Sequence, residues 1–544
     1  MVKGYTLFGR AVAAEGADTG FFIMGGPSND AINACISEGI RMIDVRHEQA
    51  AAMMANSYAR VRAKTSFCIG ASGPGTINFT TGLAHALVDG APLVAFGGAS
   101  PIENYARGAF QEIDQLAIMT PVTKFAERVY ETKRIPEYVA RAFRMARSGK
   151  PGPVYLDLPG DILYAEVDES TVIWPAPPPP VHRPAASAES VASIVDLLKK
   201  AERPILLSGS GILWSEGAEA MQRFIAKTGI PFYTTPQGRG VIPEDDANFF
   251  ALARSTAFKE ADLVIVAGTR LNYVFSYVAP PRFSSSTRIV RIDIDPDEIN
   301  SSLQLDVGIV ADVGTVLDQL TEAVPHDIAG SYAAWRNKLG AIDADKLDKH
   351  EASLANDQVP IHPLRLCKEI RDFIDRDTIL CVDGQEILNY ARQSIPSYQL
   401  GHRLNSGPFG TMGVGLPFGV GAKAAKPDHK VVVLHGDGSF GMNGLEIDTA
   451  VRHKLPLLIV ISLNGGWTAD PEQKKPGRNL GYTRFDRMAE AFDCHGEYVE
   501  KPEDIRPALE RAAAAVAQGK TALVNVVTDW RARSGTANFT NYST

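Results

Sequence analysis

Cysteine is scarce in this 544-residue sequence, and its five cysteines form no CxxC pair. This scarcity excludes a disulfide framework or a zinc cage and favours a reducing compartment. Basic residues are too few for a nucleic-acid-binding surface, since 55 Lys and Arg face 63 Asp and Glu. The longest apolar run, 455–461, is far shorter than a membrane span, and Arg10 and Glu15 interrupt the N-terminal apolar pattern that a secretory signal needs. We therefore predict a cytoplasmic protein that binds neither nucleic acid nor a membrane.

Apolar runs typical of buried strands alternate with longer helical patterns along the whole chain. Examples are 93–96, 263–266, 431–434 and 458–461. Nearly continuous apolar strands between helices are typical of parallel sheets that are covered on both faces. The sequence therefore predicts an α/β fold built from doubly wound parallel sheets.

Two changes in composition divide the chain into three predicted domains. The proline-rich stretch 175–184 can form neither a helix nor a central strand, so it indicates a semi-rigid linker. A polar stretch from about Ala333 to Pro360 favours helix and indicates a bridge to the last domain. The predicted domains are 1–170, 185–330 and 360–544.

The most informative segment contains two apolar strands with polar residues at their ends. The first strand ends at Gly436-Asp437-Gly438, and the second ends at Asn464, 27 residues after Asp437. Ligands bind beyond the carboxyl ends of strands in open α/β sheets. We therefore expect Asp437 and Asn464 to lie side by side at one edge of the sheet.

The same segment indicates an anion-binding turn. Gly436 and Gly438 let the backbone approach an anion closely, and the N–H groups of Ser439 and Phe440 open a helix that we expect to start at about Met442. Unpaired N–H groups and the helix dipole attract phosphate to such an end. A diphosphate is the expected ligand.

Mg²⁺ prefers oxygen ligands, and a diphosphate often supplies some of them. The protein can supply the others from one carboxylate, one amide and one backbone carbonyl. A GDG turn alone is a common structural feature. A GDG turn followed by an Asn at this distance resembles the thiamine-diphosphate enzyme superfamily, although Leu463 stands where that family often has a first Asn. The resemblance implies thiamine diphosphate as cofactor, Mg²⁺ bound by Asp437, Asn464 and the Gly466 carbonyl, and chemistry at a carbon–carbon bond next to a carbonyl.

This cofactor needs a carboxyl group that donates a proton to its aminopyrimidine ring, which a carboxyl does well when an apolar site raises its pKa. Glu48 stands between a short strand and an alanine-rich helical segment. The Arg-His-Glu pattern at 46–48 resembles the family's glutamate motif and implies a catalytic role for Glu48. The structural alternative is a first-turn glutamate that satisfies a helix N-terminus.

Two glycine-rich segments resemble the family's other cofactor contacts. In 407–417 the resemblance implies that Met412 lies beneath the bent cofactor, and a core methionine is the alternative. Segment 71–78, which includes Gly73, resembles the loop around the pyrimidine ring, and Gln385 is a further expected contact. The family's sites form between the first domain of one subunit and the third domain of another. This implies a homo-oligomer, with a tetramer built as a dimer of dimers.

The second predicted domain contains a nucleotide-binding pattern. Its strand 289–293 ends in Asp293, and an acidic residue at a strand end is typical of ribose recognition. The Arg270-Leu-Asn-Tyr segment resembles oxalyl-CoA decarboxylases and 2-hydroxyacyl-CoA lyases, which bind ADP, more than acetolactate synthases, which bind FAD. The resemblance implies Lys150, Arg270 and Asp293 around ADP. The alternatives are FAD, or no nucleotide and an Asp293 that caps a turn.

Residues near the expected reaction centre distinguish branches of the family. Phe110-Gln111 resembles the loop of 2-hydroxyacyl-CoA lyases and benzaldehyde lyase, whereas oxalyl-CoA decarboxylases have Tyr-Glu there. A neutral Gln can bind a hydroxyl without repelling a developing alkoxide. Gly25 and Gly26 stand where benzaldehyde lyase has a histidine, which indicates a roomier pocket.

Two C-terminal segments complete the expected substrate site. The tail 529–544, with its Ser534-Gly pair, resembles the tail that closes over acyl-CoA in the CoA-using branch, and a disordered end is the alternative. Loop 467–479, which begins at Trp467, indicates a lid that excludes water. The expected substrate contacts are Gly25, Gly26, Phe110, Trp467 and Ser534, with Gln111 as a catalytic residue that orients the hydroxyl.

These resemblances imply a 2-hydroxyacyl-CoA lyase that cleaves the C1–C2 bond of a substrate such as 2-hydroxyisobutyryl-CoA and releases an aldehyde or ketone plus formyl-CoA. One alternative is a CoA-independent carboligase or lyase like benzaldehyde lyase or acetolactate synthase. Another is a non-enzymatic Rossmann-type nucleotide-binding protein. The last alternative would explain the GDG turn but not Glu48, Met412 and Asn464 together.

Overall fold

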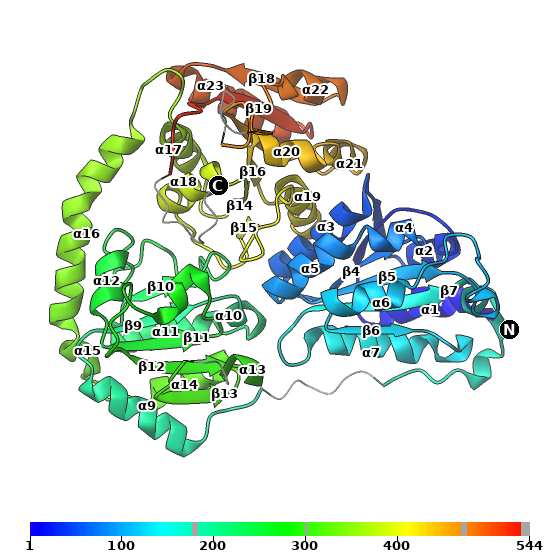
Figure 1. Ribbon diagram of the computed structural model, residues 1–544, viewed down its shortest axis with the longest axis horizontal. Helices are drawn as coiled ribbons and strands as arrows, with labels where there is room; N and C mark the ends of the chain where they lie inside the picture. Colours follow the sequence, from blue (N-terminus) through cyan, green and yellow to red (C-terminus); the bar gives the residue numbers. More distant parts are fainter. Residues whose placement is uncertain (177–182, 300–302, 469–475, 535–544) are drawn as a thin grey trace.

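Three separate parallel β-sheets with helices on both faces form three lobes in the computed structural model of the chain (Figure 1). The structure describes residues 1–176, 183–299, 303–468 and 476–534. All the described strand pairs within these three sheets are parallel, as the sequence predicts for a doubly wound α/β fold. In these described ranges no helix combines the length and the apolar character that crossing a membrane requires.

The first sheet lies between two helical layers. Its strand order is β3 (Arg41–Asp44), β2 (Thr19–Phe22), β4 (Ser66–Gly70), β5 (Leu93–Ala99), β7 (Pro153–Pro159) and β6 (Phe125–Arg128). The helices of one face are α1 (Gly4–Ala14), α2 (Asn29–Ser37) and α7 (Ile135–Arg147), and those of the other are α3 (Glu48–Arg62) and α5 (Thr80–Asp89). Every residue of β4, β5 and β7 is buried, because both faces of these central strands pack against helices.

The second sheet has the strand order β10 (Phe232–Thr234), β9 (Pro204–Ser208), β11 (Leu263–Ala267), β12 (Arg288–Asp293) and β13 (Val307–Val310). Its covering helices include α9 (Ala188–Lys200), α11 (Ala218–Thr228), α12 (Arg254–Glu260) and α14 (Val313–Ala323). In α11 the buried residues Met221, Phe224, Ile225 and Thr228 recur at the three- and four-residue spacing of one helix face.

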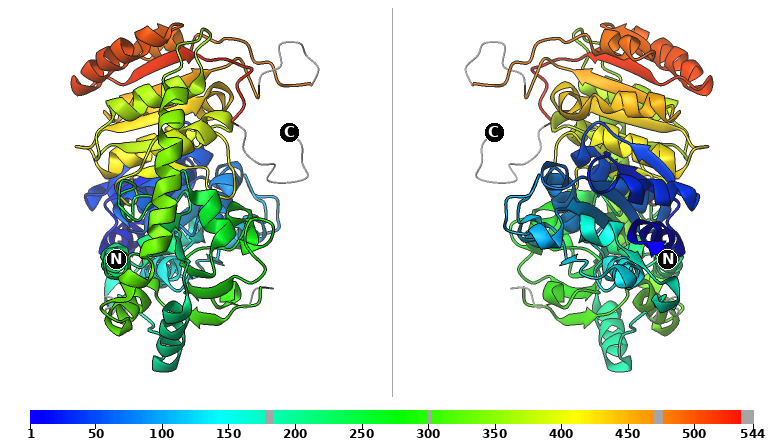
Figure 2. Two further views of the ribbon diagram at one scale, coloured as in Figure 1. Left: turned by 90° about the vertical axis from the view of Figure 1, so that its left-hand side faces the viewer. Right: turned by 90° about the vertical axis from the view of Figure 1, so that its right-hand side faces the viewer.

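The polar stretch after the second domain forms one long helix. This helix, α16 (Ala333–Leu354), runs along the outside of the molecule from the second lobe to the third (Figures 1 and 2). Only Trp335, Leu339 and Leu354 are buried along it, which agrees with its polar sequence. The helix therefore connects the second lobe with the third, where the sequence predicted a helical bridge.

The third sheet carries the GDG segment. Its strand order is β15 (Arg403–Asn405), β14 (Ile379–Asp383), β16 (Val431–Gly436), β17 (Leu458–Leu463), β19 (Ala522–Val527) and β18 (His495–Val499). Its helices include α17 (Pro363–Phe373), α18 (Glu386–Ser394), α19 (Gly415–Ala425), α20 (Asp437–Asn443), α21 (Glu446–Arg452), α22 (Phe485–Ala491) and α23 (Ile505–Ala517). The expected helix start at about Met442 was wrong, because α20 begins directly after β16, at Asp437, and Met442 lies in its last turn.

The first and third lobes pack together through α3 and α19, which lie side by side at the centre of Figure 1. Both helices are almost entirely buried and rich in small residues. A Cβ atom at Gly421 of α19 would lie only 2.9 Å from the Met54 Cα of α3. Glycine at this position therefore permits a close approach of the two helix backbones.

A buried polar cluster joins all three lobes around Asp89, the last residue of α5. The Asp89 carboxylate accepts hydrogen bonds from His85 Nε2 at 2.9 Å, from Arg60 Nη1 at 3.5 Å, and from Gln237 Nε2 of the second lobe. Gly407 of the third lobe packs directly against the same carboxylate. Burial alone would raise the pKa of Asp89, but His85 and Arg60 hold it below its usual value.

We predict that Asp89→Ala lowers the free energy of unfolding by about 3–5 kcal/mol, because the substitution leaves the buried Arg60 guanidinium without its carboxylate. Urea titration of the purified protein measures the difference. Because the pKa of Asp89 is lowered in the folded state, this stabilisation is present near neutral pH and is lost as pH falls through that pKa.

Asp245→Ala is the matched control, since the Asp245–Arg376 pair also joins the second and third lobes but is exposed to solvent. It should change stability very little. Equal effects of the two substitutions would contradict the importance assigned to the buried cluster.

Candidate functional site

Asp437 ties together the ends of two neighbouring strands of the third sheet. Its Oδ1 accepts a hydrogen bond from Gly438 N at 2.8 Å, and its Oδ2 accepts one from Gly465 N at 2.7 Å. The side chain is 4% exposed, and burial raises its pKa to about 6. Among the described residues no Lys, Arg or His forms an ion pair with it. A buried carboxylate with only backbone donors around it fits a site for a cation.

Asn464 and Gly466 lie in the turn that follows β17, beside Asp437. Asn464 Oδ1 accepts a hydrogen bond from Gly466 N at 3.3 Å. A Cβ atom at Gly438 would lie 2.8 Å from the Trp467 ring, so the GDG turn and the Asn464 turn pack against each other. The carboxylate, amide and carbonyl oxygens gathered here fit Mg²⁺, which needs few protein ligands when a diphosphate supplies others. No group of three His, Cys, Asp or Glu side chains suited to a different metal occurs in the described part of the chain.

The start of α20 is held by side chains of its own segment. Ser439 Oγ donates to the Gly436 carbonyl at 3.0 Å and pairs with His435 Nδ1 at 3.0 Å. Phe440 is 1% exposed and packs against His435 and Phe485. The side chains of Ser439 and Phe440 therefore support the turn, and their backbone N–H groups are the parts that could contact a diphosphate.

The turn that carries Met412 depends on a residue that sequence reasoning missed. Asp383, at the end of β14, is fully buried and accepts hydrogen bonds from Gly384 N at 2.7 Å and Gly415 N at 2.9 Å. Burial raises the pKa of Asp383 to about 6. Gly413 has φ +84°, a conformation that suits glycine, and Met412 before it is half-buried. Asp383 could have been found in the sequence, because it stands at the end of an apolar strand.

Gln385 and Ser534 both lie near the start of α18. Gln385 is exposed and directly precedes this helix. Ser534 N donates to Glu386 Oε2 at 2.8 Å, and Asn389 Nδ2 donates to Ser534 Oγ at 3.3 Å. The described part of the tail therefore lies against α18 at Ser534, and its predicted contact with acyl-CoA stays a prediction. The remainder of the tail, 535–544, and most of the predicted lid, 469–475, lie outside the described residues.

Glu48 is the first residue of α3 and lies 8% exposed in the first lobe. Its Oε2 accepts a hydrogen bond from Asn78 Nδ2 at 2.9 Å, and its Oε1 would lie 3.2 Å from a Cβ atom at Gly75. Loop 71–78 therefore lies against the carboxyl group at Gly75 and Asn78. Asn78 was not singled out from the sequence, although it ends the loop that was. A buried glutamate with a neutral partner suits proton donation.

Gln111 and the two N-terminal glycines meet at Ser72 of the same loop. Ser72 Oγ donates to Gln111 Oε1 at 3.0 Å, and Ser72 N donates to the Gly26 carbonyl at 3.2 Å. Gly73, with φ +61°, packs against the Gln111 backbone, and neighbouring Gly25 packs against Ala71. The structure thus gathers the predicted residues of the first lobe around loop 71–78.

Phe110, next to Gln111, is 86% exposed. Among the described residues, no hydrogen bond or ion pair connects Glu48 or Gln111 with the Asp437–Asn464 group. Within one chain the predicted cofactor and substrate residues therefore form two groups, one on the first lobe and one on the third, and we call these groups half-sites.

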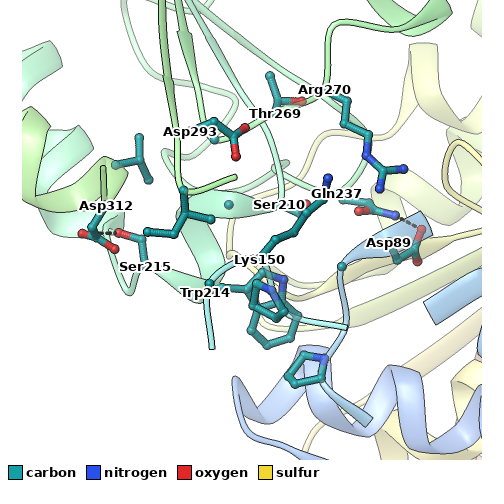
Figure 3. Close-up of a pocket in the computed structure, with 18 of the residues that line it drawn as sticks. Asp89, Lys150, Ser210, Trp214, Ser215, Gln237, Thr269, Arg270, Asp293 and Asp312 are labelled. Carbon is teal, nitrogen blue, oxygen red and sulfur yellow. Dashed lines mark hydrogen bonds between the residues drawn. The ribbon is translucent and has the colours of Figure 1, made fainter. Parts of the chain in front are cut away.

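A cavity of 530 Å³ between the first and second lobes contains the predicted nucleotide residues Lys150, Arg270 and Asp293 (Figure 3). Figure 3 shows Asp312 with Ser215 at one end of this cavity and Asp89 with Gln237 at the other.

The charges around this cavity are largely paired. Lys150 Nζ lies 2.9 Å from both Asp295 and Glu298, and Arg270 Nε lies 3.2 Å from Glu298. Burial raises the pKa of Asp293 to about 6. The sequence did not indicate Glu298, which forms ion pairs with both cations that were predicted to lie around ADP.

Family models match all three lobes. The thiamine pyrophosphate enzyme models match as follows: the N-terminal TPP binding domain at residues 2–118, the central domain at 191–320, and the C-terminal TPP binding domain at 386–526. TPP, thiamine pyrophosphate, is the compound called thiamine diphosphate above.

Several relatives match nearly the whole chain. The acetolactate synthase large subunit of Mycobacterium tuberculosis is 32% identical, over 96% of this chain and 95% of the relative. The 2-hydroxyacyl-CoA lyase of Oryza sativa subsp. japonica is 32% identical, over 97% and 96%. The oxalyl-CoA decarboxylase of Escherichia coli K12 is 31% identical, over 97% and 95%. The alternative of a non-enzymatic nucleotide-binding protein is therefore excluded, and the chain belongs to the thiamine pyrophosphate enzymes and is a thiamine-diphosphate-dependent enzyme.

Proposed function

We propose that the chain is a 2-hydroxyacyl-CoA lyase that cleaves the C1–C2 bond of its substrate and releases formyl-CoA and an aldehyde or ketone. Relatives named 2-hydroxyacyl-CoA lyase and oxalyl-CoA decarboxylase support a CoA-linked substrate. The relatives named acetolactate synthase are equally similar, so the choice depends on the chain's own residues. Gly25 and Gly26 support a small, branched substrate such as 2-hydroxyisobutyryl-CoA.

The observation that carries the proposal is a group of three arginines between the second and third lobes: Arg254, Arg282 and Arg392. All three are half-buried, and none has a carboxylate within 4 Å among the described residues. Burial is the largest cause that lowers the pKa of Arg254 to about 9, and the positive charges of Arg282 and Arg392 contribute in the same direction. Arg254 Nε has no hydrogen-bond partner. Arg254 and Arg282 lie over the Phe258 ring, but no carboxylate of the described residues neutralises their charges. Partly buried guanidinium groups without a carboxylate partner fit the phosphates of CoA.

Helix α18 connects this arginine group with the expected reaction centre. Gln385 and Ser534 lie at the start of α18, whereas Arg392 lies near its end. Arg392 stands seven positions after Gln385, a rise of roughly 10 Å along the helix at 1.5 Å per residue. A substrate with a long arm between thioester and phosphates can reach both places, whereas a free aldehyde cannot.

The chain's own residues supply binding, orientation and proton transfer. Asp437, Asn464 and the Gly466 carbonyl would hold Mg²⁺, with the diphosphate at Gly436, Gly438 and the 439–440 N–H groups. When bound, thiamine diphosphate supplies a nucleophilic carbon and accepts the electron pair of the broken bond. The Glu48 carboxyl would hold a proton for the aminopyrimidine ring, and Gln111, oriented by Ser72, would bind the substrate hydroxyl.

The two half-sites support a homo-oligomer in which the first lobe of one subunit faces the third lobe of another. Each half-site contains only part of the required chemistry, since Glu48 and Gln111 lie on one and Asp437 on the other. We propose that the pair of half-sites closes across a dimer and that two dimers form a tetramer.

We further propose ADP as the ligand of the central cavity. Asp293 would accept hydrogen bonds from ribose hydroxyls, and Lys150 and Arg270 would bind phosphates in competition with Glu298.

Arg392→Gln should raise the KM for a 2-hydroxyacyl-CoA by roughly 10- to 100-fold, because a charge-assisted hydrogen bond is lost. It should leave kcat and the ligation of free aldehydes within about threefold, because the reaction centre is untouched. Steady-state kinetics with both substrate types measures this. The matched control is Arg376→Gln, an exposed arginine of the same lobe. Equal losses with acyl-CoA and free aldehyde would contradict the CoA assignment.

Denaturation of the purified protein should release thiamine diphosphate and ADP in equal amounts, as measured by mass spectrometry. Arg270→Gln should weaken ADP binding by roughly tenfold in calorimetry and leave thiamine diphosphate binding unchanged. Recovery of FAD instead of ADP, or equal weakening by a control substitution of the exposed Arg223, would overturn the nucleotide proposal.

A further inference from the structure

Glu446, the first residue of α21, is a buried carboxyl group at the contact between the first and third lobes. Its Oε1 accepts hydrogen bonds from Arg46 N and His47 N, both at 3.1 Å. Its Oε2 accepts one from the Thr449 hydroxyl at 2.6 Å and a longer one from Arg46 N at 3.3 Å. The side chain is 1% exposed. Because residues 46 and 47 directly precede Glu48, a carboxyl group of the third lobe holds the backbone that leads into α3.

We propose that Glu446 is a positioning residue for Glu48, an inference that rests on the catalytic role proposed for Glu48. Asn78 holds the Glu48 carboxyl group from one side. His47 Nδ1 accepts a hydrogen bond from Gln49 N at 3.1 Å and so caps α3. Glu446 fixes the same turn from the neighbouring lobe. A catalytic group must be held within about 0.5 Å of its productive position, and these contacts restrict Glu48 in that way.

The contact depends on the shape of the side chain. Glu446 forms no ion pair within 4 Å with any residue in the described ranges. Burial raises its pKa to about 7, against the opposing effects of Thr449 and the two N–H groups. A glutamine at this position could accept both N–H groups through Oε1 and donate its amide to the Thr449 hydroxyl. The two backbone N–H groups would then keep their partner without a charge.

The arrangement also relates the two half-sites of one chain. Segment 437–452 begins with the proposed metal ligand Asp437 and contains Glu446 nine residues later. Asn443, between them, donates to the Gly413 carbonyl at 2.7 Å and contacts Met53 of α3. The segment that would bind the diphosphate is therefore also the segment that holds the turn before Glu48.

The test compares Glu446→Gln, Glu446→Ala and Glu446→Asp holoenzymes by steady-state kinetics and by hydrogen exchange of the amides at 46–49. We expect Glu446→Gln to stay within about threefold of wild type. Glu446→Ala should lower kcat by roughly 30- to 100-fold with KM changed less than about threefold, and should speed amide exchange by roughly tenfold or more. Glu446→Asp, shorter by one methylene, should fall between them.

Arg452→Gln is the matched control, because Arg452 lies on the same helix and reaches Asp44 across the same contact. It should leave both measurements near wild type. If Arg452→Gln matches Glu446→Ala, a general loss of domain contact explains the effect and the proposal fails. If Glu446→Ala does not fold, the kcat values of the other two variants decide. A lower kcat for Glu446→Gln than for Glu446→Asp would contradict the proposal that the shape of the side chain positions Glu48.

Glu48→Gln in the same assays separates the two proposals. A Glu48→Gln enzyme of normal rate would refute the proposed role of Glu48, whereas amide exchange at 46–49 would still show whether Glu446 holds that turn. Unchanged exchange in Glu446→Ala would refute the positioning role, whatever the rate of Glu48→Gln.

Discussion

The parallel pairing of β16 with β17 is the constraint on which the proposed chemistry depends. The register places Gly436 opposite Ser462, so both strands end at one edge of the sheet. The hydrogen bond from Gly465 N to Asp437 Oδ2 then fixes the two turns against each other. This contact orients a buried carboxylate, whose burial disfavours its charge, toward the place where a cation would compensate it.

Close packing between lobes fixes the second requirement, which is the position of Glu48. Small residues let α3 and α19 approach closely, and Glu446 bonds to the turn that leads into α3. Glu48 therefore occupies a position determined by two lobes, although the hydrogen bond to its side chain comes from Asn78 of its own lobe. The Asp89 cluster has a similar effect at the other end of the interface, where it joins the Gly407 turn to the wall of the central cavity.

Much of the fold could be predicted from sequence, because buried parallel strands leave apolar runs that are visible without the structure. Asp437 and Asn464 could be predicted as neighbours for the same reason, since the carboxyl ends of adjacent parallel strands meet. Glu48 and Met412 came from the family resemblance, because their roles depend on a cofactor that the sequence does not display.

The residues that could not be predicted from the sequence form contacts with residues that are far away in the chain. Glu446 follows a leucine and precedes an isoleucine and an aspartate, a pattern equally typical of an exposed helix start. Its partners lie about 400 residues earlier, and only the packing of two lobes buries it. Glu298 and Asp89 could not be predicted for the same reason, because tertiary contacts bring Lys150 to Glu298 and Arg60 to Asp89.

The most direct test of a site shared between subunits is complementation of two inactive chains. Glu48→Gln and Asp437→Ala chains are co-expressed, and the activity of the mixed population is compared with that of each variant alone. If each site uses residue 48 of one subunit and residue 437 of the other, half of the dimers contain one intact site, and about one quarter of wild-type activity returns. If both residues serve the same site within one chain, no chain has a complete set and the mixture stays inactive, which would contradict the account.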